Sequence, residues 1–162
     1  MNQVSKNEIS RRSLLKFTGA CGLTFLATGC GLTNRLAGVP QTQLPTIEDA
    51  WTYEKGKLTL DMKKLPEITK LGGAVRIEGG ALPDPILVVY GEDKNYYAFK
   101  NACTHAGRMI DPLAGTMNLQ CCSVGRSTYD YRGKVLSGPA KKALTSYPLS
   151  VDGDNIIIIV LS

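Results

Sequence analysis

Histidine is nearly absent from this chain of 162 residues, in which His105 occurs alone. A single histidine excludes a mononuclear iron site built from two histidines and one carboxylate. Cys103 and His105 are the residue types that act as nucleophile and base in a Cys–His hydrolase. Two residues apart they project side by side, and no third group is evident to orient them. The sequence therefore argues against a stand-alone enzyme of either kind.

Residues 31–162 carry almost as many acidic as basic side chains. The formal net charge is +5, from 19 Lys and Arg against 14 Asp and Glu. Four of these cations (Lys6, Arg11, Arg12 and Lys16) and one acid (Glu8) belong to the first 30 residues, so residues 31–162 keep 15 cations against 13 acids, a net of +2. This balance excludes nucleic acid as the expected partner.

Residues 1–30 have the pattern of an export signal. A basic stretch, Ser10-Arg-Arg-Ser-Leu-Leu-Lys16, precedes an uncharged run of 18 residues from Phe17 to Asn34. It resembles a twin-arginine signal, which exports already folded cargo, and a general secretory signal is the alternative. Small residues before Cys30 resemble a lipoprotein processing site, so lipidation of Cys30 is expected. An uncleaved membrane anchor is the alternative. Either outcome places the protein at a membrane, on the periplasmic or outer face.

Long helical periods are also missing from the rest of the chain. Residues 31–50 are polar and contain Pro40 and Pro45, which is typical of a tether. The folded domain is expected to span residues 51–162. It consists of short apolar runs separated by turn residues, which predicts an all-β fold.

Several strands are expected within this domain. Apolar and polar residues alternate at 57–61 and 74–78, and two hairpins are predicted, 85–90 with 96–99 and 147–151 with 156–161. The four isoleucines at 156–159 are β-branched, and we expect this strand to be buried on both faces.

Two cysteine-containing loops lie between the predicted hairpins. They read Asn101-Ala-Cys103-Thr-His105-Ala-Gly107-Arg108 and Leu119-Gln-Cys121-Cys122-Ser-Val-Gly-Arg-Ser127-Thr-Tyr129-Asp130. With Gly138-Pro139-Ala140 downstream, they resemble the Rieske domain, in which a Cys-x-His loop and a Cys-x-x-His loop hold a [2Fe-2S] cluster. The resemblance implies a Rieske-like antiparallel β-sandwich with a small two-loop cluster-binding tip.

The resemblance also implies which residues form the site. The metal ligands would be Cys103, His105 and Cys121, with Cys122 as a candidate fourth. Ser127 and Tyr129 would donate hydrogen bonds to cluster and cysteine sulfurs. Gly138 and Pro139 would belong to a cover over the cluster.

The second histidine of the family pattern is missing from the second loop. Depending on the register, its position holds Val124, Gly125 or Arg126. Three possibilities remain open on the residues alone. A [2Fe-2S] cluster still binds, or Cys103 forms a disulfide with Cys121 or Cys122 or stays a free thiol, or a lone Zn²⁺ sits on Cys103, His105 and one further thiolate.

The function expected from the resemblance is one-electron transfer. The chain would be a small membrane-tethered subunit of a respiratory or oxidoreductase complex, with a redox protein as partner and His105 as the exit group. The alternative is a clusterless structural subunit that keeps the β-fold as a docking surface.

Overall fold

The computed structural model describes residue 38 and residues 40–160 of the chain. Residues Arg35–Ser162 form one compact unit, so positions 40–50 of the expected tether belong to the same unit as the domain. No helix in the described part is long and apolar enough to cross a membrane. The export signal, Cys30 and the alternative anchor all lie outside the described residues.

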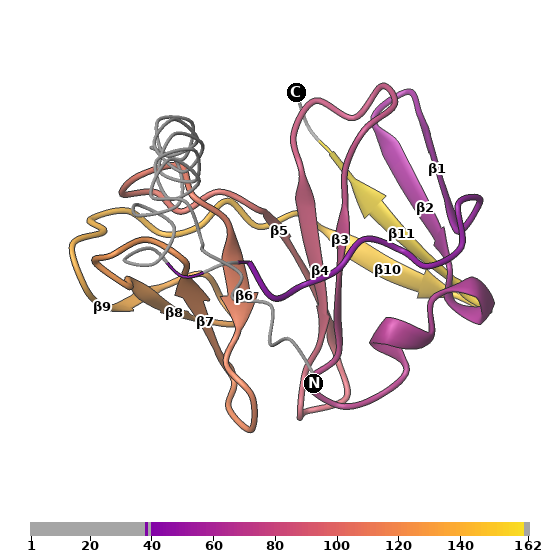
Figure 1. Cartoon of the computed structure of the whole chain (residues 1–162). Helices are drawn as coiled ribbons and strands as arrows, with labels where there is room; N and C mark the ends of the chain where they lie inside the picture. Colours follow the sequence, from indigo (N-terminus) through magenta and orange to yellow (C-terminus); the bar gives the residue numbers. More distant parts are fainter. Residues whose placement is uncertain (1–37, 39, 161–162) are drawn as a thin grey trace, which may run out of the picture. The chain divides into compact units, whose positions relative to one another are not determined.

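Three antiparallel sheets make up the fold, which confirms the all-β prediction (Figure 1). Two 3-10 turns, η1 and η2, interrupt the strands at Met62–Lys64 and Pro66–Ile68. The first sheet has the order β1 (Trp51–Glu54), β2 (Lys57–Asp61), β11 (Asn155–Ile159), β10 (Leu149–Asp152). The second is β3 (Ala74–Ile77), β4 (Ile86–Tyr90), β5 (Tyr96–Lys100). The third is β6 (Ile110–Pro112), β7 (Asn118–Cys121), β8 (Thr128–Asp130), β9 (Val135–Ser137).

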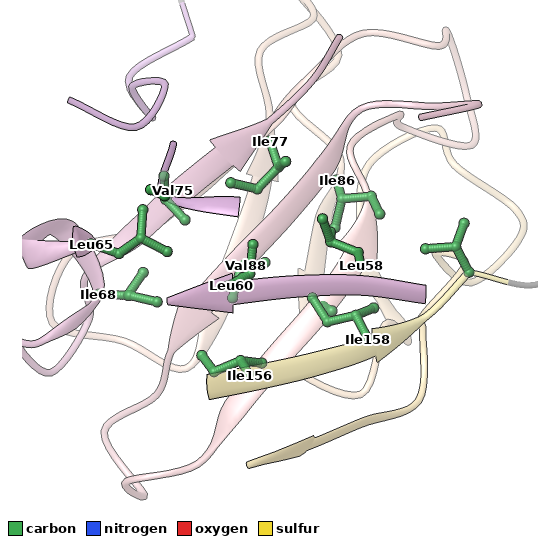
Figure 2. Packing of buried hydrophobic residues seen from close by; sticks show 13 residues of the cluster. Leu58, Leu60, Leu65, Ile68, Val75, Ile77, Ile86, Val88, Ile156 and Ile158 are labelled. Atoms are coloured by element: carbon green, nitrogen blue, oxygen red, sulfur yellow. The ribbon is translucent and has the colours of Figure 1, made fainter. Parts of the chain in front are cut away.

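The central strand of the fold is β4, which is buried on both faces. Ile86 and Val88 pack into a core shared with the first sheet, shown in Figure 2. Leu87 and Val89 pack into a second core shared with the third sheet. Because side chains alternate along a strand, β4 supplies both cores and joins the site-bearing sheet to the rest.

The isoleucine run is arranged differently from the prediction. In β11, Ile156 and Ile158 are fully buried in the first core, while Ile159 is 39% exposed and Ile157 is half-buried. The expectation of burial on both faces was therefore wrong. The reason is that β11 lies in a sheet with one packed face, so an apolar run there still follows the two-residue alternation.

Both predicted hairpins are present. β4 pairs with β5 from Ile86↔Lys100 to Tyr90↔Tyr96. β10 pairs with β11 as far as Asp152↔Asn155, which leaves a two-residue turn with Gly153 at a φ of 57°. A positive φ at this position is what a tight hairpin turn requires.

The segment before β1 lies against the third sheet. The Asp111 carboxylate on β6 accepts the backbone N–H of Gln41 at 3.0 Å and that of Thr42 at 2.9 Å. The N–H of Arg76 on β3 donates to the Gln43 carbonyl at 2.9 Å. Residues 41–43, which we call the strap, are therefore fastened beside the cysteine loops.

Candidate functional site

The first cysteine loop folds back on itself between β5 and β6. The Cys103 N–H donates to the Arg108 carbonyl at 2.7 Å, and the Gly107 N–H donates to the Cys103 carbonyl at 2.8 Å. The Asn101 side chain accepts the Ile110 N–H at 2.8 Å and so closes the base of the loop. This closure holds the Cys103 side chain in the second core, where the residue is only 2% exposed.

The second loop starts where β7 ends, at Cys121, which pairs with Ile110 of β6. The Cys121 N–H donates to the Ser127 carbonyl at 2.9 Å, which closes the loop. The Cys122 N–H donates to the Met109 carbonyl at 3.0 Å and so links the two loops. The prediction that the two loops fold toward one another at one end of the β-scaffold is therefore confirmed.

Two thiols meet inside this pocket. The Tyr129 hydroxyl lies 3.1 Å from the Cys103 sulfur, and the Cys121 thiol hydrogen-bonds to Cys103. Ser123 contacts Cys121: the Cys121 thiol donates to the Ser123 Oγ at 3.1 Å, and the Ser123 N–H donates to the Cys121 sulfur at 3.4 Å. Each buried thiol therefore has its own hydroxyl partner.

These contacts and burial shift the pKa values of the two thiols in opposite directions. Burial opposes ionisation of Cys103, yet hydrogen bonds from Tyr129, Cys121 and the backbone N–H groups of its loop outweigh it and lower the pKa of Cys103. Burial raises the pKa of Cys121 to about 11. Burial and the hydrogen bond to Cys103 raise the pKa of Tyr129 to about 12. The hydroxyl therefore stays protonated and is able to donate a hydrogen bond to the Cys103 sulfur.

Cys122 is buried but belongs to a different environment. A Cβ placed on Gly38 would lie 3.7 Å from the Cys122 Cα. Cys122 lines a hollow of about 300 Å³ with Pro40, Arg108 and Met109, on the side of the N-terminal segment. Of the two adjacent cysteines, it is Cys121 that the structure brings to Cys103. All three cysteines of the domain are free thiols.

The missing histidine corresponds to an exposed position at the tip. Counted from Cys121, the family position is held by Val124, which is 67% exposed. Its neighbour Gly125 packs closely against the cover, because a Cβ there would lie 2.6 Å from the Pro139 Cγ and 3.9 Å from the His105 Cε1. His105 is itself exposed and lies at this edge of the site.

The cover predicted at 138–140 lies over the second loop. Gly138 has a φ of 88°, and a Cβ there would lie 2.6 Å from the Ser127 Cα. The Ala140 N–H donates to the Ser127 Oγ at 3.0 Å. The Ser127 hydroxyl thus holds the cover in place, and its predicted bond to a cluster sulfur stays a prediction.

Two polar residues of the site were missed by the sequence reasoning. Ser123 contacts the Cys121 sulfur, as described above. The Thr104 hydroxyl donates to the Lys142 carbonyl at 2.6 Å and lies 3.2 Å from the Tyr129 hydroxyl, so it contacts both the tyrosine and the chain just after the cover. The signal for Ser123 was its place two residues after a cysteine, where a serine commonly hydrogen-bonds locally.

The thiols and the imidazole do not converge on one point. Within residues 38 and 40–160, no three His, Cys, Asp or Glu side chains are gathered around a common centre that one metal ion would occupy. Cys103 and Cys121 form one group of donors, and His105 stands apart at the edge.

Comparison with known families identifies this arrangement. The family model of the Rieske [2Fe-2S] domain matches residues 62–148, more than half of the chain. The chain belongs to the Rieske [2Fe-2S] domain family. The match contains both cysteine loops and the cover at 138–140, so the resemblance stated from the residues is confirmed.

Curated relatives include iron-sulfur subunits of a multi-subunit complex. The cytochrome b6-f complex iron-sulfur subunit of Synechococcus sp. (strain CC9605) is 37% identical over 81 residues, which cover 49% of this chain and 45% of the relative. The subunit of Synechococcus sp. (strain JA-3-3Ab) is 38% identical over 74 residues, covering 46% and 42%. The match therefore spans less than half the length of these curated relatives.

Solved structures confirm the fold. The ferredoxin of carbazole 1,9a-dioxygenase from Nocardioides aromaticivorans IC177 aligns with a TM-score of 0.50 and 23% identity, over 62% of this chain and 93% of that one. At this identity the likeness concerns the Rieske-type β-fold alone.

Proposed function

We propose that this protein is a Rieske-type electron-transfer protein that binds a [2Fe-2S] cluster through Cys103, Cys121 and His105. One observation carries the proposal: the two thiols are buried in the same core and hydrogen-bond to each other, and each has a hydroxyl partner. Outer donors of this kind orient the sulfurs and tune a metal centre. A bound Rieske cluster supplies reversible one-electron transfer.

The donor set fits such a cluster at three of its four protein ligands. In a Rieske centre the thiolates bind one iron and the imidazoles bind the other, so the two kinds of donor need not converge. This division suits the separation between the thiol pair and His105 better than a lone Zn²⁺, which needs its ligands around one point. Cys122 faces the N-terminal segment and so is a poor candidate for the fourth ligand.

The chain's own residues set the properties of the centre. As a thiolate Cys121 has no proton to give, so the Ser123 hydroxyl donates to it, just as Tyr129 donates to Cys103. These bonds stabilise negative charge on sulfur and raise the reduction potential. One imidazole fewer than in the family pattern acts in the opposite direction. His105, exposed at the edge, is the group through which an electron would leave toward a partner.

The proposed setting is a membrane surface outside the cytoplasm. The twin-arginine-like signal suits a protein that acquires its cofactor before export, and Cys30 offers a lipid anchor. The curated relatives are named as iron-sulfur subunits of the cytochrome b6-f complex. By analogy, this chain would be a small subunit of a respiratory or oxidoreductase complex, with a redox protein partner.

The adjacent cysteines offer a matched test of the proposal. Cys121→Ser should lose iron, sulfide and visible absorption in protein purified after native export, because it removes a thiolate beside Cys103. Cys122→Ser should retain all three, since that side chain faces away. The readout is iron and acid-labile sulfide per chain.

Two results would contradict the proposal. Equal metal content in the two variants would remove Cys121 as a ligand. A folded, iron-free and colourless parent protein would favour the clusterless docking subunit instead.

A further inference from the structure

The second loop has one position that faces solvent where the family carries an imidazole. Cys121 is the cysteine whose thiol meets Cys103, so the register of the loop is counted from it. Three residues on, Val124 is 67% exposed and offers no donor atom to a metal.

The neighbouring positions do not replace it. A side chain at Gly125 would meet the Pro139 ring, since a Cβ there lies 2.6 Å from the Pro139 Cγ. Arg126, at a φ of 42°, carries an exposed guanidinium, which is a cation without a lone pair to donate. The second loop therefore leaves the position beside His105 without a protein ligand.

The segments that form this end of the domain carry basic side chains. Exposed cations lie on both loops and directly after the cover: Arg108, Arg126, Lys141 and Lys142. The segments that carry them, residues 101–109, 122–128 and 138–145, contain no Asp or Glu. Like-signed charges concentrate counter-ions from solution, so the charge of these segments favours an anion over a cation.

We propose that Val124 leaves a coordination position open beside His105, and that a small anionic donor from solution fills it. The inference rests on the proposed function, because it needs the metal centre to be present. Binding displaces at most a water molecule and involves no electron transfer. A bound anion makes the centre more negative and so gives it a lower reduction potential than a bound neutral imidazole, which reproduces the family's ligand set.

The test uses the full-length protein, purified after native export, with azide and imidazole as probes. Iron and sulfide are measured first. Azide and imidazole should each change the visible and electron paramagnetic resonance spectra in a saturable manner, and the midpoint potential should be lower with azide bound than with imidazole bound. An Arg126→Gln, Lys141→Gln double variant should weaken the azide response and leave the imidazole response unchanged, since only azide is charged.

Val124→His supplies the donor from the chain itself. This variant should show, without additions, the spectrum that the parent shows with imidazole, and it should no longer respond to either probe. Val151→His is the matched control, because Val151 is also an exposed valine, 51% exposed on β10 of the first sheet. This control should behave as the parent does.

The outcomes separate the two proposals. A parent that contains iron and sulfide but ignores both probes, with Val124→His spectrally identical to it, would overturn the open position and leave the proposed function standing. A parent without iron or sulfide would overturn both.

Discussion

At the scale of single residues, the Tyr129 hydroxyl is the contact that bears most directly on the reduction potential of the site. It lies 3.1 Å from the Cys103 sulfur and is fixed from the other side by Thr104. The tyrosine is fully buried, so water cannot replace its hydrogen bond. A donor held in this way stabilises the reduced, more negative centre.

Tyr129→Phe should therefore lower the midpoint potential while iron and sulfide content stay unchanged. The measurement is a redox titration of the purified protein, and Tyr131→Phe is the control. Tyr131 is another buried tyrosine of the same core, but its hydroxyl has no hydrogen-bond partner. If both variants shifted the potential equally, a specific role for the Tyr129 hydroxyl would be untenable.

At this scale the sequence predicted the loop residues but not the choice between adjacent cysteines. Cys103, Cys121 and Tyr129 came from the family resemblance, and the structure brings them together. The sequence could not decide whether Cys121 or Cys122 is the ligand beside Cys103, because both fit the motif. The strand register decides it: pairing with Ile110 turns Cys121 toward the core, and the next side chain must then face the other way.

Among the elements, the cover depends on a glycine. Gly138 combines a φ of 88° with a close approach to the Ser127 backbone, where a Cβ would lie 2.6 Å from the Cα. The second contact cannot be relieved by rotating a side chain. Replacement therefore has to move either the cover or the second loop.

Gly138→Ala should destabilise the protein more than Gly153→Ala. Both place a Cβ in the left-handed region, at about 1–2 kcal/mol, but Gly153 has no atom within 4 Å of the added Cβ. The clash at Gly138 should add roughly 1–3 kcal/mol. Denaturant unfolding gives the comparison, and equal losses in the two variants would contradict the contact.

The strap depends on a single carboxylate. Asp111 accepts the N–H groups of Gln41 and Thr42, and the residue is only 8% exposed. Hydrogen bonds to a buried charged group contribute more than neutral ones do.

Asp111→Asn should lower the free energy of unfolding by about 1–3 kcal/mol and make the strap at residues 41–43 sensitive to protease. Asp154→Asn is the control, because Asp154 makes an exposed pair with Lys63 that contributes little to stability. Limited proteolysis followed by mass spectrometry locates the cleavage. A strap that stays protected in Asp111→Asn would show that other contacts hold it.

Most strands of the first and second sheets were predictable, whereas those of the third were not. Alternation and turn residues predicted β2, β3 and both hairpins. β6, β8 and β9 have only three residues each, which is too short for a two-residue period to stand out within loops. The strap was also unpredictable, because its partner Asp111 lies 70 positions from Gln41 along the chain.

At the scale of the whole molecule, the proposed function places a redox domain at a membrane. If Cys30 carries the lipid, Cys30→Ala should still be exported but should be released into the soluble fraction, since the acyl chains supply the attachment. Replacing both Arg11 and Arg12 with Lys should instead keep the protein in the cytoplasm. Fractionation and immunoblotting distinguish these results, and a membrane-bound Cys30→Ala protein would favour the uncleaved anchor.

The proposed function requires this chain to hold a [2Fe-2S] cluster with His105 as its one imidazole ligand. Pulsed electron paramagnetic resonance of the dithionite-reduced, natively exported protein tests it directly, because His105 is the sole histidine and any imidazole coupling must come from it. We expect a [2Fe-2S] signal coupled to nitrogen from a single imidazole, and we expect the His105→Ala variant to lose that coupling. No cluster signal, or a signal without imidazole coupling, would contradict it.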